Sequence, residues 1–324
     1  MYSDPRAALE PPVEHPDLPP NSDEDAPPAP WLTMLNDLLR QLMGSGPLAL
    51  AQRFLVDPEV ARALDSLDIP VNSAGFDPWG FSPEEAKIYY TLAKHIYAYF
   101  RPEITGIENI PAGRVLIVPN HSGQLPADGL VVAAACLLKA PRPRLVRAMA
   151  ERWVSTLPFV NEAFSRAGVV LGDPINCRNL LNEGNAILVF PEGVRGSGKT
   201  FQHRYQLVPF GRGFLRLALQ TDTPIVPVGV VGGEESIISV YNWKGLARLL
   251  RAPYAPVSPL LPLLGPLAYM PLPVKFRVHF GAPMHFTGPF DDEDAVIDRK
   301  VEEVRGQVAA LIRQGLAERR SWFT

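Results

Sequence analysis

One histidine stands in a setting where it could act as a base. His121 follows the apolar stretch 115–118 through Pro119 and Asn120, and Asp128 lies seven positions further on. Such a stretch predicts a buried strand, and α/β enzymes carry reactive groups at the carboxyl ends of buried strands. A carboxylate that reaches the imidazole fixes its tautomer and steadies the imidazolium, which is the minimal unit for general-base catalysis. The alternative is that Asp128 caps the following helix and His121 is an incidental loop residue.

The other histidines and the cysteines show no comparable pattern. Five histidines lie in tail, surface or strand-end surroundings and are better explained as solvated or packed side chains: His15, His95, His203, His279 and His285. The two cysteines, Cys136 and Cys177, have no partner at metal-ligand spacing, so we expect no metal site and a reducing compartment.

A second loop is rich in glycine and carries two cations. Residues 193–200 read Gly-Val-Arg-Gly-Ser-Gly-Lys-Thr and follow an apolar stretch at 186–190. The pattern matches the phosphate loop of nucleoside triphosphatases, but Pro209 and Gly211 cut short the helix that such a loop should open. No later apolar strand ends in an acid that could hold magnesium. What remains is a glycine loop whose Arg195 and Lys199 are suited to bind a phosphate.

Three blocks of sequence, taken in order, resemble the glycerophospholipid acyltransferase family, which includes glycerol-3-phosphate and lysophosphatidic acid acyltransferases. The blocks are Asn120-His121 with Asp128, then Phe190-Pro191-Glu192-Gly193-Val194-Arg195, then Val226-Pro227-Val228. The resemblance spans about residues 100–290. Arg166, before Gly168, is a loose match to the remaining block of the family.

The resemblance implies a reaction and a role for each residue. His121 would deprotonate an acceptor hydroxyl, which attacks the thioester of acyl-CoA or acyl carrier protein directly, without an acyl-enzyme. Asp128 would orient His121, while Glu192, Gly193 and Arg195 would bind the glycerol-phosphate end of the acceptor. Arg166 and Lys199 are further candidates for substrate binding, and the Val226–Val228 block would shape the acyl side. Beyond the acyl donor, the family implies neither a cofactor nor a metal.

Two departures from the family pattern leave alternatives open. Six residues separate His121 from Asp128 where the family usually has four, and Val194 replaces the usual threonine. The longer spacing resembles that of members that act on neutral lipids, so a diacylglycerol or alcohol acceptor is an alternative to lysophosphatidic acid. A lipid-binding module without activity is a second alternative. A serine hydrolase is a third, but the sequence contains no Gly-x-Ser-x-Gly around Ser122 or elsewhere.

Strand and helix patterns alternate from residue 114 onward. They predict an α/β fold with a largely parallel central sheet flanked by helices, together with an N-terminal helical region. Strands are expected at 115–118, 145–149, 169–171, 186–190, 225–231 and 274–280, and helices at 128–138, 152–166, 179–182, 214–220 and 291–319. A capping box at Ser82, with Pro83 at the first helical position, opens a helix that runs to about Phe100.

The composition divides the 324-residue chain into four parts. Residues 1–30 hold nine prolines, seven acids and one base, which predicts a disordered tail. Residues 31–100 form the helical region, 101–290 the acyltransferase domain and 291–324 a C-terminal helix. The net charge of −3 favours no nucleic-acid partner.

Two apolar segments point to a membrane surface. Residues 31–43 place tryptophan and leucine along one helical face, after an N-terminus that shows no signal-peptide pattern. Residues 252–274 carry no charge over 23 positions, but their seven prolines argue against a straight spanning helix. A kinked surface segment or the lining of an acyl tunnel fits better. The resemblance places the protein on the cytoplasmic side of a membrane, bound to one leaflet.

Overall fold

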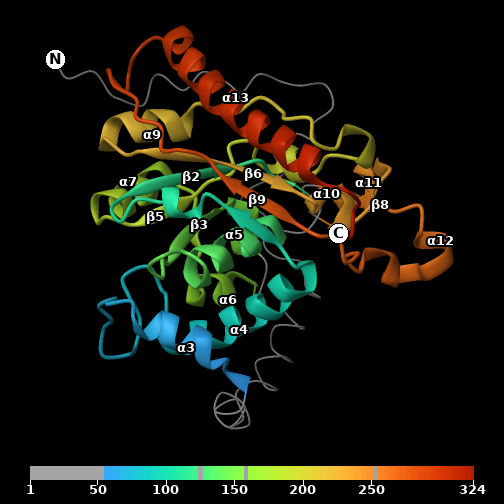
Figure 1. Cartoon of the computed structure of the whole chain (residues 1–324), viewed down its shortest axis with the longest axis horizontal. Helices are drawn as coiled ribbons and strands as arrows, with labels where there is room; N and C mark the ends of the chain where they lie inside the picture. Colours follow the sequence, from blue (N-terminus) through green and yellow to red (C-terminus); the bar gives the residue numbers. More distant parts are fainter. Residues whose placement is uncertain (1–54, 123–126, 157–159, 251–253) are drawn as a thin grey trace.

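A seven-stranded sheet forms the centre of the computed structural model, which describes residues 55–122, 127–156, 160–250 and 254–324 (Figure 1). The strand order is β1-β9-β6-β2-β5-β3-β4. The strands are β1 (Glu103–Thr105), β2 (Val115–Pro119), β3 (Val146–Ala150), β4 (Val170–Leu171), β5 (Ala186–Leu188), β6 (Ile225–Val231) and β9 (Arg277–Phe280). Five neighbours from β6 to β4 run parallel, whereas β9 is antiparallel to β6 and parallel to β1. The prediction of a largely parallel sheet is confirmed.

Helices cover both faces of the sheet, as buried parallel sheets require. On one face lie α7 (Pro174–Asn182), α9 (Gly213–Thr221) and α13 (Asp294–Glu318); on the other lie α4 (Pro83–Phe100) and α5 (Ala127–Leu138) (Figure 1). Strand β2 shows why its apolar run is continuous. Leu116 and Val118 enter the α7–α9–α13 core, whereas Val115 and Ile117 enter the core beneath α5. All five residues of β2 are buried.

Ser82 caps α4 as predicted, but the second hydrogen bond of the capping box, from the Ser82 N–H to the Glu85 side chain, is not formed. Ser82 accepts a hydrogen bond from the backbone N–H of Glu85, and Pro83 occupies the first turn. The Ser82 N–H donates to the carbonyl of Arg166 at 3.2 Å, at the end of α6 (Val160–Arg166). The first turn of α4 is therefore tied to α6 as well as to its own cap.

Some expectations differ from the structure or lie outside it. The helix predicted over 152–166 is divided into a 3-10 turn, Arg152–Thr156, and α6. The sequence places Pro158 between them, and a proline disfavours helix both at its own position and at the one before. Strand β1 was not predicted. The tail 1–30 and the helix 31–43 lie outside the described residues, and the boundaries 31–100, 101–290 and 291–324 stay predictions.

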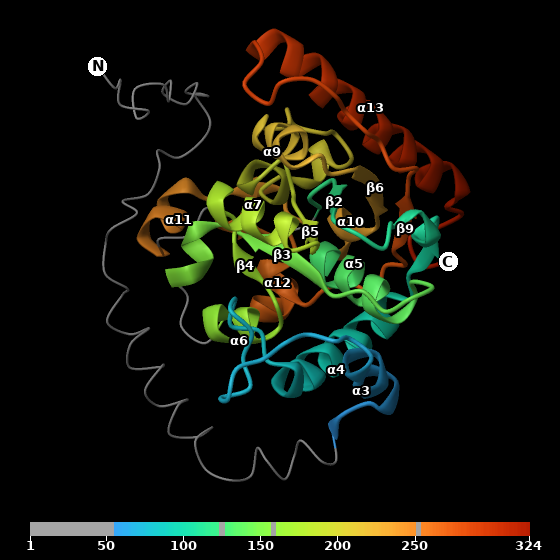
Figure 2. The same cartoon turned by 90° about the vertical axis from the view of Figure 1, so that its left-hand side faces the viewer.

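Between α10 (Gly233–Ser236) and β9, the chain makes a long excursion from the sheet (Figures 1 and 2). It contains β7 (Tyr241–Asn242), α11 (Lys244–Leu250), β8 (Pro256–Val257), α12 (Leu261–Leu264) and the 3-10 helix Gly265–Tyr269. Its two ends meet where the Leu272 N–H donates to the Ser236 carbonyl at 2.7 Å. Across the described parts of the chain, every helix is too short or too polar to cross a membrane.

The helices α3 (Pro58–Asp65) and α4 form a smaller core against α5. The connection between α3 and α4 is fixed by a buried ion pair between Asp77 and Arg147 of β3. Asp77 also accepts hydrogen bonds from the backbone N–H groups of Trp79 and Phe81, each at 2.8 Å. Arg147 lies 5.1 Å from the centroid of the Phe81 ring.

Replacing Asp77 with alanine should destabilise the fold, because the guanidinium of Arg147 would stay buried without its counter-charge. We expect Asp77→Ala to lower the free energy of unfolding by about 3–5 kcal/mol, measured by urea denaturation. The matched control is Glu84→Ala, because the Glu84 side chain is 78 % exposed. This variant removes only an ion pair to Lys87 at the surface. That variant should lose no more than about 1 kcal/mol. Equal losses in the two variants would contradict the assignment.

Candidate active site

Four neighbouring parallel strands deliver their following residues to one edge of the sheet. His121 follows β2, Glu151 follows β3, the glycine loop follows β5, and the Gly232–Glu235 segment follows β6. Because carboxyl ends of parallel strands share an edge, residues far apart in sequence meet there. The glycine loop itself contains only the short helix α8 (Val194–Ser197).

His121 and Asp128 are in direct contact. The Nδ1 atom of His121 lies 2.7 Å from Oδ2 of Asp128, and the Asp128 side chain is fully buried. The same carboxylate accepts the backbone N–H groups of Ser122 and Gly129, each at 2.7 Å. Asp128 thus lies in the first turn of α5 and holds the imidazole, so His121 is not an incidental loop residue. Its contact with Nδ1 leaves Nε2 to act on a substrate.

The loop that carries His121 is held from two further directions. The Asn120 side chain exchanges two hydrogen bonds with the backbone of Val230 in β6, at 3.0 and 2.7 Å. The Phe190 ring stacks on the imidazole with centroids 4.2 Å apart. Gly196 packs so closely that an added Cβ would lie 2.8 Å from the His121 Cβ. The imidazole is therefore fixed by neighbours on three strands or loops.

The surroundings of His121 favour its charged form. Burial by itself lowers the pKa of His121, but the charge and hydrogen bond of Asp128 oppose this effect. Glu192 and Glu151 add to the opposing effect, and the resulting pKa lies above the ordinary histidine value. An imidazole whose pKa is raised in this way is a stronger base once it is neutral.

The Glu192 side chain is buried and bonded within the protein. Its Oε1 accepts the backbone N–H of His121 at 2.9 Å, and its Oε2 accepts the N–H of Val208 at 2.9 Å. The ammonium of Lys199 lies 3.4 Å from Oε2. Glu192 thus joins the histidine loop to the glycine loop, and its expected role in binding the acceptor stays a prediction.

Lys199 lies between two buried carboxylates. Its Nζ is 2.8 Å from Oε1 of Glu234, a residue that follows β6, and its side chain is 6 % exposed. Glu234 in turn accepts the backbone N–H of Tyr205. Burial raises the pKa of Glu234, while the nearby ammonium of Lys199 opposes that shift. The positive charge of Lys199, which the sequence suggested for phosphate binding, is therefore paired with two carboxylates of the protein itself.

A second polar cluster continues from Tyr205 toward the C-terminal helix. The Tyr205 hydroxyl donates to Glu235, whose other oxygen lies 2.8 Å from the guanidinium of Arg319. Arg319 also donates to the Tyr205 hydroxyl at 3.1 Å, as does the backbone N–H of Gly232 at 3.0 Å. Sequence reasoning missed Glu234, Glu235 and Arg319, because no local pattern marks side chains whose partners are distant in sequence.

The remaining predicted residues take different places. Arg195 is half-buried and donates to the carbonyl of Pro209 at 3.2 Å. Gly193 has a φ of 57°, and an added Cβ there would lie 3.2 Å from Glu151. Arg166 ends α6, before the edge strand β4, where it lies 4.0 Å from the Phe76 ring and pairs with Glu85 and Glu162. The structure does not bring Arg166 to His121.

Two alternative interpretations lose support from this geometry. In the phosphate-loop pattern the lysine should face a nucleotide, but Lys199 faces Glu192 and Glu234, and α8 has four residues instead of opening a long helix. Ser122, the weak candidate for a hydrolase nucleophile, is 1 % exposed, and its Oγ lies 2.3 Å from where a Cβ on Gly233 would be. A nucleophile must be open to its substrate, and this hydroxyl is not.

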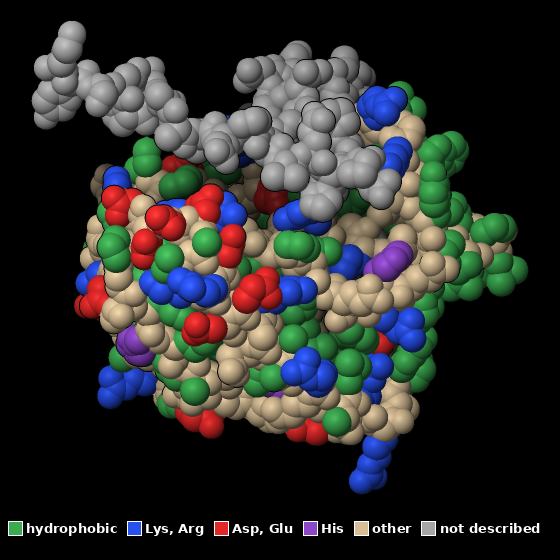
Figure 3. Space-filling model, turned by 90° about the horizontal axis from the view of Figure 1, so that it is seen from above, with side chains coloured by type: hydrophobic (Ala, Val, Ile, Leu, Met, Phe, Trp, Pro, Cys, Tyr) green, Lys and Arg blue, Asp and Glu red, His purple; other side chains and the backbone are tan. Residues whose placement is uncertain are grey.

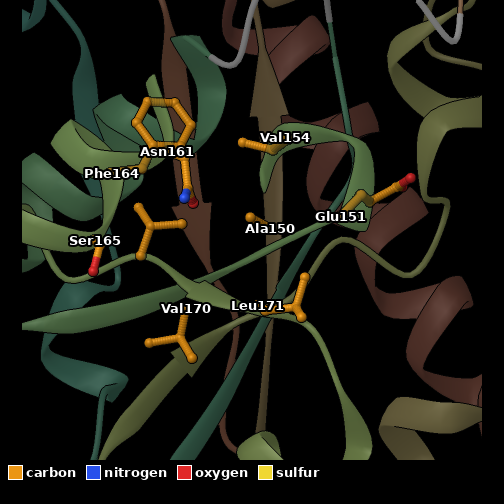
Figure 4. Close-up of a pocket in the computed structure, with 9 residues that line it drawn as sticks. Ala150, Glu151, Val154, Asn161, Phe164, Ser165, Val170 and Leu171 are labelled. Atoms are coloured by element: carbon orange, nitrogen blue, oxygen red, sulfur yellow. The ribbon is translucent and has the colours of Figure 1, made fainter. Parts of the chain in front are cut away.

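A small cavity lies beside the site, between α6 and the ends of β3 and β4 (Figure 4). Its volume is about 30 Å³, far less than an acyl chain needs. The lining is largely apolar, with Val154, Phe164 and Leu171 among its residues. The Glu151 side chain points away from these apolar groups (Figure 4), and its charge contributes to the raised pKa of His121. Glu151 therefore lines this cavity and also acts through its charge on His121.

Comparisons with known proteins agree with this geometry. A family model described as Acyltransferase matches residues 101–231. An uncharacterized protein of Mycobacterium tuberculosis is 39 % identical over 261 residues, which cover 79 % of this chain and 72 % of that protein. The 1-acyl-sn-glycerol-3-phosphate acyltransferase alpha of Homo sapiens is 29 % identical over 156 residues, 46 % of this chain and 53 % of that one. The chain belongs to the glycerolipid acyltransferase family. It is an acyltransferase of lipid biosynthesis.

Two further proteins are similar to this acyltransferase at lower identity. The Gallus gallus "DGAT1/2-independent enzyme synthesizing storage lipids" is 27 % identical over 212 residues, 65 % of this chain and 58 % of that enzyme. The solved structure of the 1-acyl-sn-glycerophosphate acyltransferase PlsC from Thermotoga maritima has a TM-score of 0.44 and 17 % identity. That comparison covers 90 % of this chain and 99 % of the other.

If Lys199 positions the acyltransferase site through Glu192, its removal should change turnover more than acceptor affinity. Lys199→Met leaves two buried carboxylates without their shared cation, which should cost about 3–5 kcal/mol of stability. We expect kcat to fall at least ten-fold, with KM for the acceptor nearly unchanged, in a thiol-release assay.

The double variant Lys199→Met/Glu234→Gln tests this role, because it removes one of the two unpaired charges. It should regain part of both stability and kcat. Lys300→Met is the control, since Lys300 bonds a surface carbonyl at Thr287 and should behave as wild type. A large rise in KM that Glu234→Gln does not relieve would instead identify Lys199 as a phosphate ligand.

Proposed function

We propose that this acyltransferase moves a fatty acyl group from acyl-CoA or acyl carrier protein to a hydroxyl of a glycerolipid acceptor such as lysophosphatidic acid. The observation that carries the proposal is the 2.7 Å contact between His121 Nδ1 and the buried carboxylate of Asp128. This contact is the arrangement that a general base requires. It lies at the sheet edge where the glycine loop also begins.

In the proposed reaction, Nε2 of His121 accepts the proton of the acceptor hydroxyl. The oxygen attacks the thioester carbonyl, so a C–O bond forms and the C–S bond breaks. The thiolate leaves and takes the proton from the imidazolium, which restores neutral His121. Asp128 stabilises the transient imidazolium, and no acyl-enzyme forms. No step in this scheme uses a metal or a bound cofactor.

Arg195 is the residue that we assign to the phosphate of the acceptor. It belongs to the glycine loop, directly before Gly196, which packs on His121. Because Lys199 is engaged by Glu192 and Glu234, Arg195 is the more available of the two cations proposed from the sequence. Gly193 supports this role, since its positive φ lets the loop turn next to Glu151.

A neutral-lipid acceptor, such as diacylglycerol or an alcohol, is the second candidate. It is favoured by the internal neutralisation of Lys199 and by the similarity to the storage-lipid enzyme of Gallus gallus. We further propose that the protein works on the cytoplasmic face of a membrane, bound to one leaflet, where acceptors of both kinds reside.

The base role of His121 has two consequences for the pH dependence of the reaction. His121→Ala should lower kcat by at least a hundred-fold, the contribution expected of a general base. In the wild type, kcat/KM should fall as the pH drops through the raised pKa of His121, because only neutral imidazole accepts a proton. Asp128→Asn removes the charge that raises this pKa, so the acidic limb should move to lower pH while the maximal rate falls.

These outcomes are measured as free thiol release over a pH series, with products identified by mass spectrometry. Equal, slow release by wild type and His121→Ala across a panel of acceptors would leave only a lipid-binding module. An acidic limb that Asp128→Asn does not move would assign the titration to another group.

The two acceptor classes are separated by Arg195→Met. If Arg195 binds phosphate, this variant should raise KM for lysophosphatidic acid about ten-fold or more, because a hydrogen bond to a charged group is lost. KM for monoacylglycerol or diacylglycerol should stay within two-fold of wild type. An equal change for both classes would show that Arg195 does not recognise the phosphate.

A further inference from the structure

The excursion between α10 and β9 exposes an unusual share of large apolar side chains. Of the seventeen exposed large hydrophobic residues in the described chain, eight lie between residues 240 and 270. They include Trp243 at 56 % exposure, Leu249 at 80 %, Leu263 at 81 % and Met270 at 64 %. Scattered exposed leucines are ordinary, but a concentration of this kind marks an interaction surface.

The charge of the same segment has one sign. Between Glu235 and Asp291 the sequence contains no aspartate or glutamate, and residues 237–274 hold three cations: Lys244, Arg248 and Arg251. Lys244 and Arg248 are exposed on α11, the helix that also exposes Leu249. Apolar side chains interspersed with cations, and without acids, complement a membrane surface, where anionic headgroups lie above a layer of acyl chains.

The excursion projects from the body of the molecule. In Figure 1, α12 stands away from the sheet at the side opposite to α7, and hydrophobic side chains gather on the corresponding projection at the right-hand edge of Figure 3. A convex projection can enter a deformable lipid interface without a matching groove. Tyr241 and Trp243, both exposed, are the residue types that prefer the boundary between lipid and water.

The inner side of the excursion rests on the glycine loop. The Asn242 side chain donates to the carbonyl of Gly198, and the backbone N–H of Phe201 donates to the carbonyl of Ser239 at 2.7 Å. Tyr254 hydrogen-bonds Ser197. Burial raises the pKa of its hydroxyl, and it lies close enough to Asp128 and Glu151 for their charges to raise this pKa further. The segment that carries the apolar surface is therefore joined directly to the loop beside His121.

We propose that the described residues 240–250 and 254–270 form a docking surface for anionic membrane lipid, and that they set the glycine loop against the bilayer. The surface rests on the proposed function, whose acceptor is itself a lipid. Docking through this segment places the loop, and with it His121, next to the leaflet from which the acceptor is drawn. In this proposal the projection is the part of the protein that contacts the membrane, and the lipids that it binds carry negatively charged headgroups.

Co-sedimentation of the full-length protein with vesicles tests the surface. We expect strong binding to vesicles of equal parts phosphatidylglycerol and phosphatidylcholine, and weaker binding to phosphatidylcholine alone. Leu263→Asp/Leu267→Asp should weaken binding to the anionic vesicles at least ten-fold. Lys244→Ala/Arg248→Ala should weaken it by up to about thirty-fold, from roughly 1 kcal/mol per cation, and should leave binding to phosphatidylcholine unchanged.

Ile175→Asp is the matched control, because Ile175 is 59 % exposed on α7 and should sediment as wild type. Unchanged sedimentation of Leu263→Asp/Leu267→Asp would overturn the proposal. So would light scattering that shows a wild-type dimer and a variant monomer with equal vesicle binding, since the surface would then join two copies of the chain.

The docking surface and the proposed reaction fail in distinguishable ways. With a water-soluble short-chain acceptor and no vesicles, Leu263→Asp/Leu267→Asp should release thiol at the wild-type rate, whereas His121→Ala should not. Vesicle binding by a wild type that transfers no acyl group would refute the reaction and support the surface. Acyl transfer without selective binding to the anionic vesicles would support the reaction and refute the docking surface.

Discussion

The site depends on the hydrogen-bonded bridge that the buried carboxylate of Glu192 makes between two loops. One of its oxygens holds the backbone of His121, and the other holds Val208 and lies near Lys199. Without that bridge, the loop after β2 and the loop after β5 would share an edge of the sheet but would not be held in register. Burial of the bridge raises its electrostatic strength, because the surroundings are poorer in water.

The same bridge explains why a cationic loop is not a nucleotide cradle. Burying Glu192 requires a compensating positive charge, and Lys199 supplies it while also pairing with Glu234. An unpaired buried carboxylate would be costly, whereas a pair with additional hydrogen bonds is tolerated. The glycines near this pair leave room for it: a Cβ on Gly196 would lie 2.6 Å from the Cβ of Glu192. The composition of the loop thus serves close packing around the ion pair as well as contact with a substrate.

Much of the sheet could be predicted from the sequence, since β2 and β6 are apolar on both faces and therefore appear as continuous runs. The contact of His121 with Asp128 was also within reach, because both residues lie on one loop. The environment of Lys199 was not, because Glu234 is 35 positions away and meets it only through strand order. Arg166 shows the converse: a loose local match pairs in the structure with Glu85 and Glu162 and not with His121, which sequence spacing does not reveal.

The contact of Arg319 with Glu235 joins residues 84 positions apart, and a ribosome makes them in that order. At roughly 5–20 residues per second, Glu235 is synthesised about 4–17 seconds before the guanidinium that pairs with it, and Tyr205 is synthesised earlier still. During this interval the polar cluster next to the glycine loop carries an unmatched negative charge and favours hydration over burial. The cluster of Tyr205, Glu235 and Arg319 can therefore be completed only after α13 has been made, later in synthesis than the strands that hold the site.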